Sequence, residues 1–427
     1  MSIFIRGGRL VDPASERDGT HDLYLADGRI AGIDSPPTGF KAEQTIDAAG
    51  LVVCPGLVDL CARLREPGAE HIATIASETR AAAAGGITHL ICPPDTRPVI
   101  DTPAMARMVR DRAAEMGLAR VHPLGALTVG LEGNRLTDMA MLTDAGCVGV
   151  SNALAPLENS LVLRRAMQYA AGFDIPVFLY PQDPWLQGNG CVHEGEISTR
   201  LGLPAIPEAA ETVGVARDLA LIETSGARAH FHLISCGRAL EMIEEAERRE
   251  LPVTAGVAVH NLHLTENDIG AFDTLYKVLP PLRSAADREA LRRGVASGSI
   301  SAICSDHQPH GADAKLAPFG EAAPGISGLE TLLPLTLRLV REELLTLPRA
   351  IAALTSNPAQ IAGLEAGRIA IGDPADLCIF DPDAQWTLTE EDMLSRGRNT
   401  PFLGSELTGR VMCTLVDGRI VHSRISP

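Results

Sequence analysis

The chain has 427 residues, enough for two or three domains, and its hydrophobic fraction of 45% allows a large aliphatic core. Its net charge of -17 argues against nucleic acid or an anionic membrane surface as a partner. The nine cysteines form no CxxC pair and several lie in apolar runs, as buried thiols do in a reducing compartment. The sequence shows neither a secretion signal nor an apolar run of roughly 18 residues, so we expect a cytoplasmic protein.

Both ends of the chain are predicted to form short strands. Residues 3–11 and 22–30 alternate apolar and polar side chains, and Asp27-Gly28 is typical of a hairpin turn. Two stretches near the other end repeat this pattern, with a matching turn at Asp417-Gly418. We therefore expect residues 1–54 and 361–427 to build one small β-sandwich domain together.

Residues 55–360 alternate apolar runs with segments of helical periodicity, among them 72–84, 161–171, 208–224 and 238–249. This alternation predicts an α/β fold with a (β/α)8 TIM barrel. A helical solenoid is the alternative, but the segments have no fixed period. The catalytic residues of such a barrel lie at the carboxyl ends of the strands, so those ends are the candidate site. The strands are expected at 57–61, 87–93, 121–128, 148–152, 175–180, 228–234, 252–257 and 301–305.

Motifs at these strand ends carry a family resemblance. Residues 55–68 are PGLVDLCARLREPG, residues 194–204 are EGEISTRLGLP, and residues 305–310 are SDHQPH. In this order they resemble the amidohydrolase superfamily and, within it, the dihydroorotases. The resemblance extends over the whole chain. It implies a barrel of amidohydrolase type whose active members hydrolyse a cyclic amide at a metal centre.

The resemblance also implies the positions of the metal ligands, and most of those ligands are missing. Active members carry two histidines on the first barrel strand, where this chain has Cys61 and Arg63. The fourth strand should supply an anionic bridge, but Asn152 and its neighbours carry no charge. The fifth strand should supply a histidine, and Tyr180 stands there.

Only His232 on the sixth strand and Asp306 on the eighth match the implied ligands. Two residues cannot hold a catalytic zinc, which takes three protein ligands and a water. Arg63 adds a guanidinium group that has no lone pair to offer a metal. We expect Arg63 to pair with Asp306 within about 6 Å and to replace the missing cation. A mononuclear site of Cys61, His232 and Asp306 is the alternative.

Positions that hold the substrate in the resembling enzymes have changed as well. Arg65 and His310 match, although Arg65 is equally compatible with a structural ion pair to a neighbouring acid. Asp95 replaces an asparagine and would repel a substrate carboxylate unless Arg97 neutralises it. Leu279 replaces the asparagine that touches the substrate ring.

These losses predict a catalytically inactive dihydroorotase-like protein without metal, cofactor or bound substrate. The resemblance includes inactive chains that assemble with the catalytic chain of aspartate transcarbamoylase, six copies of each, and we expect a non-catalytic structural subunit of that kind. Self-association is left open. One alternative is a cyclic-amide hydrolase, a dihydroorotase with the atypical Cys61, His232 and Asp306 metal site. Another is a regulator that holds a carboxylated pyrimidine with Arg65 and His310.

Overall fold

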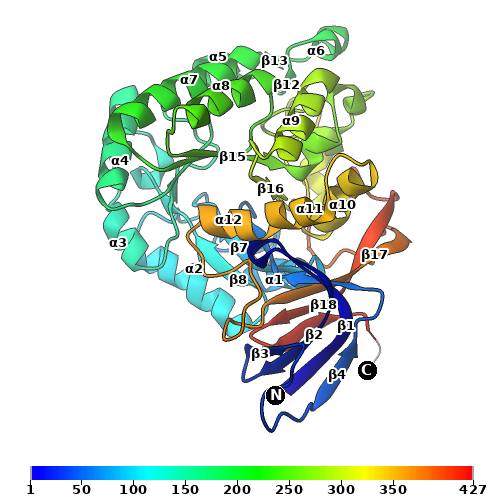
Figure 1. Ribbon diagram of the computed structural model, residues 1–427. Coiled ribbons are helices and arrows are strands. Elements are labelled where there is room, and N and C mark those ends of the chain that lie inside the picture. The colour runs from blue at the N-terminus through cyan, green and yellow to red at the C-terminus, as the bar shows by residue number, and fades with distance from the viewer. Residues whose placement is uncertain (1, 426–427) are drawn as a thin grey trace.

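The computed structural model describes residues 2–425, which form a barrel of parallel strands beside a separate sheet (Figure 1). The chain starts in the sheet, passes through the barrel and returns to the sheet, so that the blue and red ends of the ribbon lie together. The predicted fold class, an α/β barrel with a β-rich domain from both termini, is confirmed. The division at residues 54 and 361 stays a prediction.

The separate sheet has eight strands in the order β19-β18-β17-β5-β1-β2-β3, with β4 paired to β1. Antiparallel pairing of β17 with β5, with Cys378 opposite Cys54, joins the two ends of the chain. The predicted turns at Asp27-Gly28 and Asp417-Gly418 are confirmed and they touch: a Cβ on Gly28 would lie 3.0 Å from the Asp417 carbonyl oxygen. The strands are β1 (Ser2–Asp12), β2 (Arg17–Ala26), β3 (Arg29–Ile33), β4 (Gln44–Asp47), β5 (Val52–Pro55), β17 (Leu377–Thr387), β18 (Glu406–Val416) and β19 (Arg419–Ser423).

The barrel strands are parallel and nearly all their residues are buried. The single strand expected at 121–128 is divided in two, because β8 pairs with β7 on one side and β9 pairs with β10 on the other. The strands are β6 (Leu57–Asp59), β7 (Ile87–Cys92), β8 (Arg120–Pro123), β9 (Gly125–Ala126), β10 (Val150–Ser151), β11 (Val177–Leu179), β14 (Ala229–Phe231), β15 (Val253–Ala258) and β16 (Ala302–Cys304).

The barrel closes between its first and last strands. Ala62 after β6 forms a parallel bridge with His307 after β16. The Arg63 N–H donates to the His307 carbonyl at 2.9 Å, and the His307 N–H donates to the Cys61 carbonyl at 3.1 Å. These bonds bring the carboxyl ends of β6 and β16 side by side, and the candidate residues lie there.

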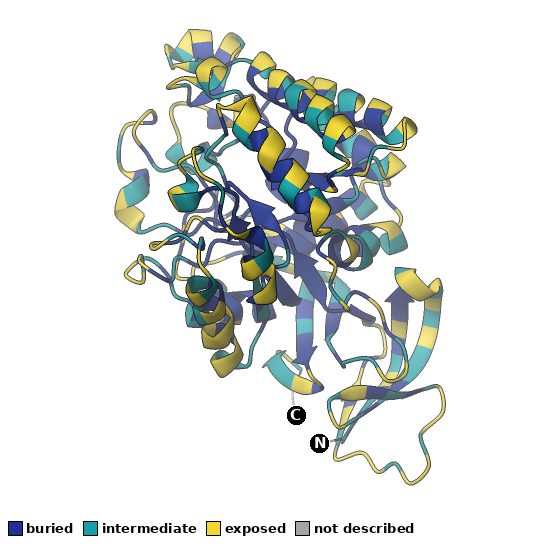
Figure 2. Cartoon of the chain, turned by 90° about the vertical axis from the view of Figure 1, so that its left-hand side faces the viewer, coloured by how far each residue is buried: buried dark blue, intermediate teal, exposed yellow. Residues whose placement is uncertain are grey.

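Helices surround the barrel with buried inner and exposed outer faces (Figure 2). In α8, for example, Leu240 and Ile243 are buried while Arg238 and Glu241 are exposed, the spacing of an amphipathic helix. No helix within residues 2–425 has the length and apolarity to cross a membrane. The main helices are α1 (Ile75–Ala84), α2 (Pro103–Met116), α3 (Met139–Asp144), α4 (Ser160–Gly172), α7 (Glu208–Ser225), α8 (Gly237–Arg248), α9 (Ala285–Ser297), α10 (Leu332–Arg341), α11 (Leu347–Leu354) and α12 (Ser356–Ile361).

A small excursion lies between β11 and α7. It consists of α5 (Pro184–Gln187), β12 (Val192–His193), α6 (Glu196–Leu201) and β13 (Ala205–Ile206), with β12 and β13 paired in parallel. Its apolar side chains, such as Ile197, pack on Ile269 and Phe319 from two later loops. The excursion is therefore anchored to the rest of the barrel.

Candidate functional site

Arg63 lies at the centre of the candidate site. Its side chain is 5% exposed and contacts Asp306, which is fully buried at the neighbouring strand end. The Arg63 Nη1 donates to Asp306 Oδ1 at 3.3 Å, well inside the expected limit of about 6 Å, so the predicted pair is confirmed. The same Nη1 also lies 3.8 Å from the Cys61 sulfur. The Arg63 guanidinium thus lies beside both Cys61 and Asp306, two of the residues that would have to hold a metal.

Asp306 has two further polar neighbours and a strained backbone. Gln308 Nε2 donates to both carboxylate oxygens, at 3.1 and 3.2 Å, and the Cys61 thiol donates to Oδ1 at 3.5 Å. Asp306 has a φ of 44°, a left-handed conformation that is uncommon outside glycine. Burial raises the pKa of Asp306 to about 6, although Arg63, Gln308 and Cys61 each act to lower it. Sequence reasoning missed Gln308, whose only signal is a glutamine where the resembling motif has an alanine.

The partner of Asp95 is Arg63, and not Arg97 as the sequence left possible. Asp95 accepts a 2.7 Å hydrogen bond from Nε of Arg63, and Arg97 forms no ion pair with any of residues 2–425. The reason is position: Arg63 is directed inward at the end of β6, whereas Arg97 is exposed on the loop after β7. Burial lowers the pKa of Arg63, but the charges of Asp95, Cys61 and Asp306 outweigh it and raise that pKa, so Arg63 stays charged.

The metal ligands implied by the resemblance do not fit this arrangement. Among residues 2–425, no group of three or more histidine, cysteine or acidic side chains could hold a metal ion. Burial, followed by the charge of Asp306, raises the pKa of the Cys61 thiol well above its ordinary value. A neutral thiol is a poor zinc ligand, and Arg63 places a positive charge beside it. The alternative site of Cys61, His232 and Asp306 therefore does not suit a cation.

The two remaining substituted positions make no metal ligand either. The amide of Asn152 accepts from Thr128 Oγ1 at 2.8 Å and donates to the carbonyl oxygens of Leu131 and Ala155, so its polar atoms serve the local loop. Tyr180 is buried among the strand ends, and its hydroxyl has no hydrogen-bond partner within the described chain. Burial raises the pKa of Tyr180, which keeps the phenol neutral.

His232 is retained but stays neutral. Burial, and after it His230 and Arg63, lowers the pKa of His232 well below its ordinary value. The two imidazole rings are 5.6 Å apart. His230 shares a 2.9 Å hydrogen bond with Thr254 Oγ1 through Nδ1, so this ring nitrogen is bonded to the neighbouring strand.

The retained substrate positions lie together at the mouth of the barrel. Arg65 donates to the Pro309 carbonyl at 2.9 Å and lies 3.2 Å from Nε2 of His310. Arg65 forms no ion pair with an acidic side chain in residues 2–425, so the structural ion pair considered for it is absent there. Both residues line a pocket of about 440 Å³, together with Asp95, but Leu279 does not.

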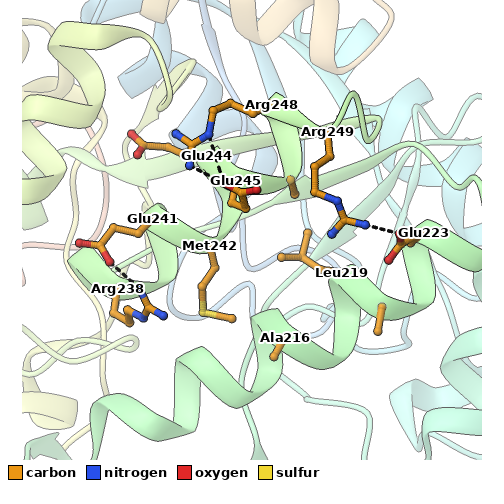
Figure 3. Close-up of a pocket in the computed structure, with 12 residues that line it drawn as sticks. Ala216, Leu219, Glu223, Arg238, Glu241, Met242, Glu244, Glu245, Arg248 and Arg249 are labelled. Carbon is orange, nitrogen blue, oxygen red and sulfur yellow. Dashed lines mark hydrogen bonds and ion pairs between the residues drawn. The ribbon is translucent and has the colours of Figure 1, made fainter.

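A larger hollow lies on the outer surface between α7 and α8 (Figure 3). Its volume is about 610 Å³, but each of its arginines is already paired with a glutamate. Arg238 bonds Glu241 at 2.7 Å and Arg248 bonds Glu245 at 2.6 Å, in the pattern of ordinary surface helices. This groove is remote from the strand ends and holds no group suited to catalysis.

Comparisons with known proteins match the site to a family. Residues 50–238 match the family described as "Dihydro-orotase-like", and residues 186–421 match "Amidohydrolase family". A "Dihydroorotase-like protein" of Pseudomonas aeruginosa is 51% identical over 99% of this chain and 100% of its own length. The chain belongs to the dihydroorotase-like amidohydrolases.

Other relatives of this dihydroorotase-like chain carry the name of the enzyme. A "Dihydroorotase" of Syntrophotalea carbinolica is 45% identical over 99% of this chain and 99% of its own length. Among solved structures, an L-hydantoinase from Arthrobacter aurescens superposes with a TM-score of 0.88, covering 99% of this chain and 96% of the other. At 24% identity, that likeness establishes the shared fold alone.

Proposed function

We propose that this dihydroorotase-like chain is non-catalytic. The observation that carries the proposal is the Arg63 guanidinium, which bonds Asp306 at 3.3 Å and Asp95 at 2.7 Å where the resemblance implies a metal. A guanidinium cannot bind a water and lower its pKa, as a zinc ion does. Hydrolysis of a cyclic amide in this family depends on such an activated water.

No other group near Arg63 supplies the missing chemistry. A general base must be free to take a proton from the attacking water. Asp306 is occupied by Arg63 and Gln308, and it is fully buried. Tyr180 is a neutral phenol with its pKa raised by burial, so it is no base at neutral pH. The electrostatic balance of the site is therefore kept while its reactivity is lost.

The retained scaffold supports a structural role. We propose that the chain assembles with the catalytic chain of aspartate transcarbamoylase, six copies of each, and stabilises that enzyme in pyrimidine biosynthesis. Supporting this, the losses are confined to the strand ends, whereas the barrel, the terminal sheet and the connecting motifs are intact. The chain's partner in this proposal comes from the resemblance to inactive dihydroorotase-like subunits.

Size-exclusion chromatography with light scattering tests the proposed assembly. The purified chain is mixed with the aspartate transcarbamoylase catalytic chain of the same organism, and each is also run alone. We expect one early peak that contains both chains in equal numbers and carries more transcarbamoylase activity than the catalytic chain alone. Separate elution with unchanged activity would rule the assembly out.

A second candidate function, an active dihydroorotase, is favoured by one observation. A relative 45% identical over 99% of the chain carries the name "Dihydroorotase". Against it stands the absence, within residues 2–425, of a side-chain group that could hold a metal. Metal analysis combined with a turnover assay separates the two candidates and is described at the end of the Discussion.

A further inference from the structure

The pocket at the barrel mouth carries an excess of positive charge. Three arginines line it, Arg63, Arg65 and Arg97, against the single aspartate Asp95. Arg63 is itself paired with Asp95 and with the buried Asp306, so the unpaired positive charges of the pocket are those of Arg65 and Arg97. One of the arginines, Arg63, stands where the resembling enzymes have a metal-binding histidine. The charge of Arg63 is therefore a feature of this chain and not of the resemblance.

The two loops that carry Arg65 and Arg97 are joined to each other by backbone contacts. The Arg97 N–H donates to the Pro67 carbonyl at 3.1 Å, which ties the loop after β7 to the loop after β6. Gly68 has a φ of +97°, and a Cβ at this position would lie 2.0 Å from the Arg97 carbonyl oxygen. Only glycine allows this approach, so the backbone fixes Arg65 and Arg97 on the same side of the pocket.

Several donors in the pocket have no acceptor. Arg97 forms no side-chain hydrogen bond or ion pair within residues 2–425, and Nη2 of Arg63 forms none there either. Nε2 of His310 lies 3.2 Å from an Arg65 nitrogen and 2.9 Å from the Pro324 carbonyl oxygen. One ring nitrogen cannot accept from Arg65 and donate to Pro324 together, so one of these bonds is always unmade.

The charges that surround the pocket also favour an anion in it. Burial, followed by repulsion from Arg63, lowers the pKa of Arg65 to about 10. Burial, followed by the charge of Arg65, lowers the pKa of His310 to about 4, so the imidazole is neutral and adds no charge. An anion in the pocket would relieve the repulsion between the arginines.

We propose that this pocket binds a phosphate group. Phosphate carries about −1.5 to −2 charge near pH 7 and presents three acceptor oxygens, which matches several guanidinium forks. The resemblance implies only a monocarboxylate held by Arg65 and His310, so the added arginines change the class of ligand. The inference rests on the proposed function in one respect, because Arg63 must be free of competition from a metal.

Isothermal titration calorimetry with inorganic phosphate tests the site. The full chain is titrated at pH 7.5 and low, constant ionic strength, alongside Arg97→Gln in the pocket and Arg238→Gln on the outer face of α8. We expect saturable binding of one phosphate, at least about tenfold weaker in R97Q and unchanged in R238Q. Arg97 is exposed, so R97Q is expected to keep the melting temperature of the parent.

Parallel titrations distinguish the source of the phosphate group and the alternatives. Glycerol 3-phosphate binding at least tenfold more tightly than inorganic phosphate would indicate a phosphorylated metabolite, and equal affinities would indicate free phosphate. Acetate binding as tightly as phosphate, equal weakening in R238Q, or no saturable binding would overturn the inference. Zinc is measured in the same sample: zinc with turnover refutes the proposed function, whereas zinc-free protein without phosphate binding refutes the inference alone.

Discussion

At the scale of single residues, one substitution accounts for the electrostatics of the site. A buried aspartate needs a compensating positive charge, because the cost of burying an unpaired carboxylate is several kcal/mol. Asp306 is fully buried and obtains this charge from Arg63, which is attached to the chain and cannot dissociate. The eighth-strand aspartate can therefore persist after the other metal ligands have been lost.

Replacing Arg63 should be costly. In Arg63→Ala, Asp306 loses its cation, and we expect a loss of about 3–5 kcal/mol in the free energy of unfolding by urea. The matched control is Arg6→Ala, which removes an exposed ion pair to Asp47 and should cost less than about 1 kcal/mol. Adding Asp306→Asn to R63A should recover part of the loss. An R63A protein as stable as R6A would contradict the proposed role of Arg63.

At the scale of elements, the loop after β16 is held by α1. Glu78 of α1 is buried and accepts from His307 Nε2 at 2.8 Å and from the Arg396 N–H at 3.2 Å. His307 is also the residue that bridges to the end of β6. The helix, the first strand and the last strand are thus joined around one imidazole, which fixes the shape of the site.

The pH dependence of the free energy of unfolding should show the effect of the hydrogen bond between Glu78 and His307. Burial alone would raise the pKa of Glu78, but hydrogen bonds from His307 and two serines outweigh it and lower that pKa. A carboxyl group whose pKa is lower in the folded protein stabilises the fold above the pKa of the unfolded chain, about 4.3. This stabilisation is lost as the pH falls through the pKa of the folded protein. Glu78→Gln should therefore cost about 1–3 kcal/mol at pH 7, and this difference from the parent should shrink below pH 4.

Urea unfolding of the parent and E78Q between pH 3 and pH 7 measures this difference. The control is Glu115→Gln, an exposed glutamate of α2 paired with Arg112, which should change stability by less than about 0.5 kcal/mol. A cost of E78Q that stays constant down to pH 3 would show that Glu78 does not titrate in this way.

The elements were largely predictable from the sequence, whereas the pairing of side chains was not. Alternating apolar runs located the strands, and helical periodicity located α7 and α8 to within a residue. The divided strand β8–β9 escaped prediction, because the sequence does not show which neighbouring strand each part of a stretch pairs with. The sequence left open whether Arg97 neutralises Asp95. The partner is Arg63, because the strand ends converge in three dimensions.

At the scale of the whole molecule, the structure protects all nine cysteines. Every cysteine is free and buried, as their position in apolar runs predicted. Burial raises the pKa of Cys92 to about 12 and raises that of Cys61 well above the ordinary range. Thiolates are the reactive form, so both accessibility and protonation oppose reaction.

Thiol titration with Ellman's reagent checks this picture. The native protein at pH 7.5 should react at least about tenfold more slowly than the protein unfolded in guanidinium chloride. In the unfolded protein, nine thiols per chain should react with the reagent. The addition of zinc should not change either result. A thiol that reacts rapidly in the native state and is protected by zinc would identify Cys61 as a metal-binding thiolate.

The most direct test of the central claim is the metal content of the purified chain, measured together with dihydroorotase turnover. The protein is prepared without chelators or an affinity tag, analysed by mass spectrometry for zinc, and assayed before and after addition of zinc. The account predicts zinc far below one ion per chain and no turnover in either sample, because Arg63 occupies the position of the cation. Stoichiometric zinc, with turnover that a chelator abolishes, would contradict it.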